Sequence, residues 1–205
     1  IGGSGFIGTR LSNLFSDEKF QILDINPSVS FPDSINLTDV RDLMALRQHL
    51  SGAKVIVLLA AEHRDDVVPT SLYYEVNVEG ARNVVQVMRE HDIRRLIFTS
   101  TVAVYGLNRE SPQETDKVSP FGDYGQSKWE AEEVLRGWWQ EAPDERELVI
   151  VRPCVVFGEK NRGNVYNLLK QIHSGHFLMI GPGQNYKSMA YVGNVAAFLK
   201  HLLDH

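Results

Sequence analysis

Hydrophobic and polar positions along the chain alternate in blocks that predict strands and helices in turn. Short runs of branched aliphatic and aromatic residues are typical of strands buried on both faces of a sheet; they cover residues 20–25, 54–60, 95–100 and 147–152. Stretches with helical periodicity lie around them, at residues 6–16, 39–50, 71–91, 124–140 and 192–203. This alternation predicts an α/β fold with a doubly wound parallel sheet.

The chain enters a glycine cluster at its second residue, where such a fold needs a complete first strand. It closes in the predicted helix at residues 192–203. We therefore expect a piece of a longer protein, in which the first strand and a C-terminal lobe are largely missing.

Composition narrows the class of protein. The chain has 205 residues, of which 43% are hydrophobic and 23% charged, as in an ordinary globular protein. A net charge of −5 without a basic block argues against nucleic-acid binding through bulk charge. With a single cysteine no intrachain disulfide can form, and no set of metal ligands is evident. The longest apolar run, residues 55–61, is far shorter than the roughly 20 residues that cross a bilayer.

The glycine cluster has the spacing of a dinucleotide-binding loop. Gly3, Gly5 and Gly8 match G-x-G-x-x-G, and Gly2 with the last two matches G-x-x-G-x-x-G. Both patterns let backbone N–H groups and a helix N-terminus approach a pyrophosphate. Asp24 follows about 20 residues later, where an acid bonds the adenosine ribose and disfavours a 2′-phosphate. The loop thus predicts NAD rather than NADP, with a turn at the end of the strand as the alternative for Asp24.

A tyrosine and a lysine stand one helical turn apart at Tyr124 and Lys128. An ammonium group beside a phenol favours the phenolate, which can take a proton from a substrate hydroxyl. The same spacing in Tyr166 and Lys170 is interpreted as a surface pair. Ser100 and Thr101 follow a predicted strand, at the sheet edge where ligands of α/β proteins bind.

Taken together, these residues resemble the extended short-chain dehydrogenases/reductases, specifically the sugar epimerase/dehydratase family with its Rossmann-like sheet. The resemblance covers essentially the whole chain in order. It is carried by Gly2/Gly5/Gly8, Asp24, Leu59-Ala60-Ala61, Asn77-Val78-Glu79-Gly80, Ser100-Thr101, Val104-Tyr105-Gly106, Tyr124/Lys128, Arg152-Pro153, and Tyr191-Val192 with Val195-Ala196.

The resemblance implies a role for individual residues. Tyr124 is the expected catalytic acid/base, Lys128 its pKa-lowering partner, and Thr101 a catalytic group that also binds the substrate hydroxyl. The expected NAD-binding residues are Gly2, Gly5, Phe6, Ile7, Gly8, Asp24, Asn36, Leu37, Leu59, Ala60, Ala61, Asn77, Ser100, Tyr124 and Lys128. Residues 1–157 and 188–205 would form the NAD-binding domain, and residues 158–187 would contribute to a substrate lobe.

Departures from the family's patterns refine the prediction. The dehydratase branch has an Asp-Glu pair after the catalytic threonine, whereas Val102 and Ala103 stand here. Val155 replaces an asparagine that contacts the diphosphate in many nucleotide-sugar enzymes. Arg162 is the proposed substitute for that contact, because a guanidinium pairs well with phosphate. The alternative for Arg162 is a solvated loop charge.

The resemblance implies an NAD-dependent sugar 4-epimerase. Residues 61–66, 163–169 and 187–192 resemble, within the family, enzymes that interconvert GlcNAc and GalNAc on undecaprenyl diphosphate or UDP for surface polysaccharides such as O-antigen lipopolysaccharide. The alternatives are an NAD(P)H-dependent 4-keto-sugar reductase and a non-catalytic NAD-binding protein. We expect a cytoplasmic homodimer without bound metal, and contact with the inner face of the bacterial membrane is left open.

Overall fold

The described strands are short, and each hydrogen-bonded pair among them is parallel. The computed structural model describes residues 1–16, 18–64, 66–107, 111–161, 163–179, 181–184 and 186–205. One pair joins β1 (Ile22–Asp24) to β2 (Ile35–Leu37), and another joins β6 (Val155–Phe157) to β7 (Met189–Tyr191). Between them, β3 (Val55–Leu58), β4 (Arg95–Thr99) and β5 (Glu147–Val151) form a sheet in that order.

The first residues of the chain lie between β1 and β3. The Gly2 N–H donates to the Leu23 carbonyl at 2.7 Å, and the Ile1 carbonyl accepts from the Leu59 N–H at 2.9 Å. Ile1 and Gly2 thus connect the β1–β2 pair to the central sheet. The resulting order, β2-β1-(residues 1–2)-β3-β4-β5, agrees with the predicted doubly wound topology.

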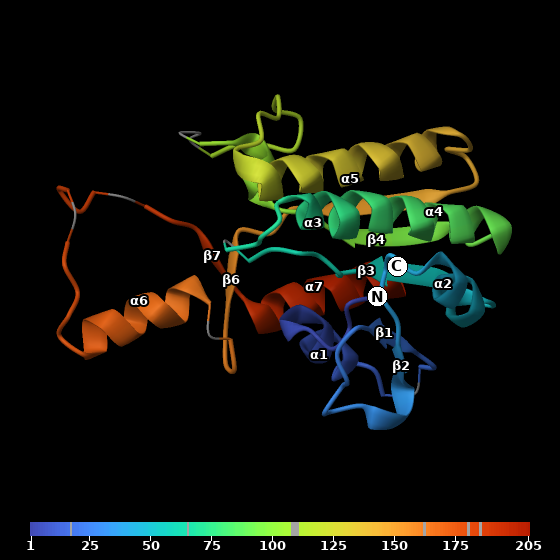
Figure 1. Ribbon diagram of the computed structural model, residues 1–205, viewed down its shortest axis with the longest axis horizontal. Helices are drawn as coiled ribbons and strands as arrows, with labels where there is room; N and C mark the ends of the chain where they lie inside the picture. Colours follow the sequence, from blue (N-terminus) through green and yellow to red (C-terminus); the bar gives the residue numbers. More distant parts are fainter. Residues whose placement is uncertain (17, 65, 108–110, 162, 180, 185) are drawn as a thin grey trace.

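Helices cover both faces of the sheet (Figure 1). On one face lie α2 (Leu43–Leu50), α4 (Gly80–Glu90) and α5 (Gly122–Gln140), and on the other α1 (Phe6–Ser12) and α7 (Val192–Asp204). The two hydrophobic cores follow from the alternation of side chains along the strands, because Leu96 and Phe98 of β4 belong to the first and Ile97 to the second.

The predicted helix over residues 71–91 is not uniform. It comprises α3 (Ser71–Tyr74), a π-helical turn η2 (Glu75–Glu79) and then α4. Such π turns are rare and often lie at functional sites. Periodicity cannot locate them, because their wider spacing depends on the tertiary contacts of the turn.

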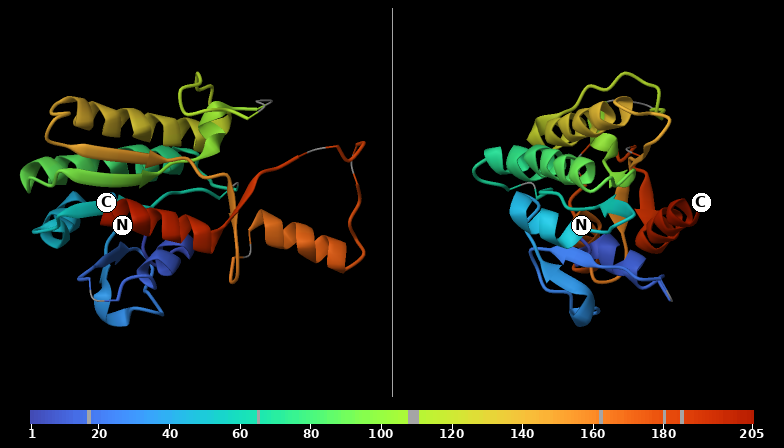
Figure 2. Two further views of the ribbon diagram at one scale, coloured as in Figure 1. Left: turned by 180° about the vertical axis from the view of Figure 1, so that it is seen from behind. Right: turned by 90° about the vertical axis from the view of Figure 1, so that its right-hand side faces the viewer.

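A segment between β6 and β7 extends away from the body of the protein. Figures 1 and 2 show α6 (Asn164–His173) and the chain that follows it projecting beyond the sheet. No described residue of α6 is buried. This excursion lies within residues 158–187, the segment that the sequence assigns to a substrate lobe.

The remaining short elements are 3-10 turns, η1 (Pro32–Ser34) and η3 (Val102–Tyr105). Within the described ranges, no helix is both long and apolar enough to span a membrane.

Candidate active site

The glycine loop packs directly against the segment that follows β3. Gly2 has a φ of +83°, and a Cβ there would overlap the backbone nitrogen of Ala60. A Cβ on Gly8 would lie 2.5 Å from the Cα of Gly3, because the start of α1 crosses the loop closely. Glycine is therefore required at both positions, because the backbone of the loop lies in direct contact with Ala60 and with the start of α1.

Asp24 links the glycine loop to the end of β1. Its Oδ2 accepts from the Ser4 N–H at 3.0 Å, and its Oδ1 accepts from the Asn26 N–H at 2.9 Å. The second bond is the turn interaction foreseen as the alternative for Asp24, and the first places the carboxylate at the dinucleotide loop. The turn interpretation of Asp24 is therefore confirmed, and its bond to the adenosine ribose stays a prediction.

The remaining expected cofactor residues line the same edge. Asn36 and Leu37 lie on β2, where Leu37 pairs in register with Asp24. Leu59, Ala60 and Ala61 follow β3 directly. Phe6 and Ile7 open α1.

The side chain of Asn77 connects two segments of the protein by hydrogen bonds. Its Oδ1 accepts from the Glu62 N–H at 2.9 Å, and its Nδ2 donates to the Glu62 carbonyl at 3.0 Å and to Ser127 Oγ at 2.9 Å. Both amide hydrogens of Asn77 are thus used between the loop after β3 and α5. A direct bond from this amide to NAD stays a prediction.

Two buried hydroxyl groups indicate whether this end of the sheet fits a polar cofactor. Ser4 Oγ and Ser100 Oγ are buried, and neither has a hydrogen-bond partner within the part of the chain that the structure describes. A buried polar atom without a partner is unfavourable by about 1–3 kcal/mol. Two such hydroxyls, Ser4 on the glycine loop and Ser100 directly after β4, fit a ligand with phosphate and ribose oxygens, as in NAD.

Tyr124 and Thr101 meet although they lie on different elements. Tyr124 is in the first turn of α5, and Thr101 caps η3 at the end of β4, where its Oγ1 accepts from the Ala103 N–H at 3.1 Å. Burial raises the pKa of the Tyr124 phenol above its usual value, and a hydrogen bond from Thr101 opposes that rise. The structure therefore brings the hydroxyl groups of these two predicted site residues into contact.

Lys128 is completely buried one turn after Tyr124. Burial lowers the pKa of its ammonium to about 7, against the opposing charge of Glu132. Its Nζ lies 4.1 Å from the centre of the Phe98 ring, a cation–π geometry. Burial dominates the pKa of Tyr124 in this structure, so a net lowering of that pKa by Lys128 stays a prediction for the cofactor-bound state.

Burial of Lys128 makes stability depend on pH. Between pH 7 and about pH 10 the unfolded chain holds a proton on this lysine that the folded chain lacks, because the folded pKa is about 7. Stability should therefore rise with pH across this window, by up to about 1.4 kcal/mol per unit from this group. Urea unfolding at a series of pH values should show a flatter rise for Lys128→Met. Lys54→Met, which replaces an exposed lysine, should keep the wild-type slope; equal slopes in both variants would contradict the assignment.

A buried ion pair was not assigned a role from the sequence. Glu132 of α5 and Arg152, just after β5, form a bidentate pair with N–O distances of 2.6 and 2.9 Å. Arg152 belongs to a motif that carries the resemblance, and Glu132 continues the spacing of Tyr124 and Lys128 by one more turn. That spacing is the signal that could have identified Glu132.

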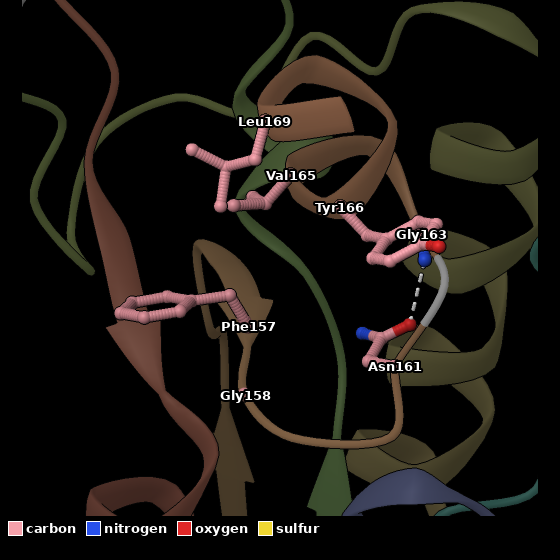
Figure 3. A pocket seen from close by; sticks show the side chains of 7 residues that line it. All are labelled: Phe157, Gly158, Asn161, Gly163, Val165, Tyr166 and Leu169. Atoms are coloured by element: carbon pink, nitrogen blue, oxygen red, sulfur yellow. Dashed lines mark hydrogen bonds between the residues drawn. The ribbon is translucent and has the colours of Figure 1, made fainter. Parts of the chain in front are cut away.

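The projecting segment contains a cavity of about 190 Å³, shown in Figure 3. Phe157 and Gly158 at the end of β6 face Val165, Tyr166 and Leu169 of α6 across it. Asn161 Oδ1 accepts from the Gly163 N–H at 2.9 Å and shapes the loop between them. Arg162, the expected diphosphate contact, lies outside the described residues. Tyr166 is exposed on α6, consistent with its interpretation as part of a surface pair.

Comparison with known proteins identifies the family. The model of the NAD dependent epimerase/dehydratase family matches residues 1–205. An N-acetyl-α-D-glucosaminyl-diphospho-ditrans,octacis-undecaprenol 4-epimerase of Escherichia coli O157:H7 is 57% identical over 206 residues, covering all of this chain and 62% of that protein. A UDP-glucose 4-epimerase of Vibrio cholerae is 28% identical over 227 residues, again covering all of this chain and 65% of the relative.

Solved structures confirm the fold. The UDP-glucose 4-epimerase of Thermus thermophilus in complex with NAD superimposes with a TM-score of 0.86 at 23% identity, over all of this chain and 73% of that one. The chain spans less than two thirds of the length of the curated relatives named above. NAD, the cofactor predicted from the glycine loop, is the cofactor of the family. On the match over its whole length, this chain belongs to the NAD dependent epimerase/dehydratase family.

Proposed function

We propose that the full-length protein is an NAD-dependent 4-epimerase that interconverts GlcNAc and GalNAc on undecaprenyl diphosphate, for surface polysaccharide synthesis. The observation that carries the proposal is the 57% identity over the whole chain to the undecaprenol-linked epimerase of E. coli O157:H7. The contact between Tyr124 and Thr101, with Lys128 one turn away, supports it.

In this proposal, Tyr124 exchanges the proton of the sugar hydroxyl at C4. The chemistry that NAD supplies when bound is to accept a hydride from that carbon and return it. Thr101 holds the same hydroxyl oxygen through its own hydroxyl, and Lys128 in its protonated form favours the phenolate form of Tyr124. Rotation of the 4-keto sugar before the hydride returns inverts the centre, with no net oxidation.

The neighbours of the catalytic residues favour epimerisation over dehydration. Val102 and Ala103 follow Thr101 in η3, and neither side chain can protonate or deprotonate the sugar to expel water. We assign the segment 158–187 to the substrate lobe, with its cavity beside Phe157 and Tyr166 as a substrate-facing surface. Arg162 stays the candidate diphosphate contact. A homodimer and a location at the inner membrane face stay predictions.

The carrier of the sugar can be tested directly. We expect the full-length protein, without added reductant, to convert GlcNAc-diphosphoundecaprenol to its GalNAc form, as measured by chromatography. A parallel tube with UDP-GlcNAc is the control for carrier specificity. Conversion of the UDP sugar alone would retain the mechanism and reject the lipid carrier.

A 4-keto-sugar reductase is the alternative with the same catalytic residues. It would consume NADH with a 4-keto sugar and give no product in either epimerase tube. A third tube therefore contains a 4-keto sugar and NADH. Absence of product in the two epimerase tubes, together with NADH oxidation in this third tube, would reject the epimerase. A non-catalytic NAD-binding protein would bind NAD and turn over none of these substrates.

A further inference from the structure

Three side chains form a connected cluster next to the catalytic candidates, and the charge of one of them, Glu132, also acts on Lys128. Glu132 is fully buried and the side chain of Arg152 is 8% exposed. The guanidinium donates through Nε to Glu132 Oε1 at 2.9 Å and through Nη2 to Oε2 at 2.6 Å. Its remaining nitrogen, Nη1, donates to the Tyr105 hydroxyl at 2.7 Å. We call Glu132, Arg152 and Tyr105 the buried triad.

Each member of the buried triad belongs to a different segment of the site. Glu132 lies on α5, two turns after Tyr124. Tyr105 ends η3, the turn that Thr101 caps. Arg152 directly follows β5, so the triad joins α5, η3 and the end of the sheet at one point.

The backbone already holds the Thr101 segment to the end of β5. The Ser100 N–H donates to the Val151 carbonyl at 2.7 Å, and the Val102 N–H donates to the Pro153 carbonyl at 3.2 Å. The bidentate pair adds a charged link from the end of β5 to α5, the helix that carries Tyr124, and the bond to Tyr105 ties η3 to the same guanidinium. A guanidinium bound in a planar fork fixes both distance and orientation.

Stability alone is a weak reason for such a cluster. The desolvation of a buried ion pair largely offsets its attraction, and well-packed apolar residues of similar volume are often equally stable or better. Directional contacts define the relative placement of the elements that they join, and apolar packing does not.

We propose that the buried triad sets the placement of Tyr124 relative to Thr101, which makes Glu132 and Arg152 positioning residues. Its consequence for turnover rests on the proposed function, whereas the placement itself does not. A displacement of about 1 Å between reacting groups can reduce a rate roughly 100-fold.

The test separates positioning from folding by comparing three variants of the full-length protein. Glu132→Gln breaks the charge pair, and Glu132→Leu with Arg152→Met replaces it by apolar side chains that restore packing. Tyr105→Phe removes only the hydrogen bond between Arg152 Nη1 and the Tyr105 hydroxyl. This variant is the one to measure if the other two do not fold. We expect kcat to fall roughly 100-fold in the double variant, while KM and NAD affinity stay unchanged and thermal stability is regained.

A matched control uses the exposed bidentate pair of Arg47 and Glu90, which joins α2 to α4 with N–O distances of 2.6 and 2.8 Å. Glu90→Gln should leave kcat at the wild-type value. A double variant that folds and regains wild-type kcat would overturn the proposal, because the triad would then only stabilise the fold.

A second measurement does not depend on turnover. In protein labelled with ¹³C at the tyrosine Cζ, the Tyr124 resonance, assigned with Tyr124→Phe, should shift in each triad variant and not in Glu90→Gln. An unchanged resonance in the folded triad variants would overturn the proposal. If the wild type converts no tested sugar, the proposed function fails and this resonance still decides the placement.

Discussion

Tyr124→Phe should abolish epimerase turnover and leave NAD binding nearly intact. The substitution removes only the hydroxyl that exchanges the substrate proton, and loss of a general acid/base lowers rates by roughly 10²- to 10⁴-fold. The ring is largely buried beside Tyr73, with ring centres 6.4 Å apart, so phenylalanine keeps the packing. Turnover of the lipid-linked sugar and NAD affinity by fluorescence titration are the two measurements.

A matched control for Tyr124→Phe is Tyr74→Phe. Tyr74 lies on α3 and donates its hydroxyl to Asp123 Oδ1 at 3.0 Å, so this variant also loses a tyrosine hydroxyl and one hydrogen bond. Its turnover should stay near the wild-type value. Full activity in Tyr124→Phe would show that another group exchanges the proton.

Gly2→Ala should weaken both the fold and NAD binding. Its backbone is in the left-handed region with a φ of +83°, and the added Cβ would overlap Ala60. Backbone strain and overpacking together should lower the free energy of unfolding by about 2–4 kcal/mol. Displacement of the loop from residues 59–61 should reduce NAD affinity by at least about tenfold. Thermal unfolding and titration with NAD measure the two effects.

Gly52 offers the control, because its φ is +80° and no atom lies within 4 Å of the position of an added Cβ. Gly52→Ala therefore carries the same backbone strain without the overlap, and should cost about 1 kcal/mol with NAD affinity unchanged. Equal losses in both variants would mean that the contact between the glycine loop and Ala60 is unimportant.

The strands and helices that could be predicted are those whose pattern is local and long. The runs at residues 54–60, 95–100 and 147–152 contain β3, β4 and β5, because strands buried on both faces need continuous apolar residues. The strands β2, β6 and β7 were missed. Each has three residues, too few for any periodicity; β1 is as short, but it falls inside the predicted run at residues 20–25.

The site divides in the same way. The spacing of the glycines, and of Tyr124 and Lys128, reflects the geometry of one loop and one helix, so it is legible in the sequence. Asn77 was predicted near the cofactor, and the structure shows its amide joining the loop after β3 to α5. That contact depends on segments distant in the chain, and no local pattern reports it.

Residue order along the chain was thus sufficient for the α/β class, the dinucleotide loop and the tyrosine–lysine pair, since each depends on neighbours within a few turns. The burial, the pKa values and the ion pairing of the site residues were decided by the packing of segments that are distant in the chain. This packing buries Lys128 and lowers its pKa to about 7, raises the pKa of Tyr124, and brings Glu132 to Arg152. Desolvation and ion pairing depend on which groups surround a side chain in space, and that environment exists only once helix and sheet have come together.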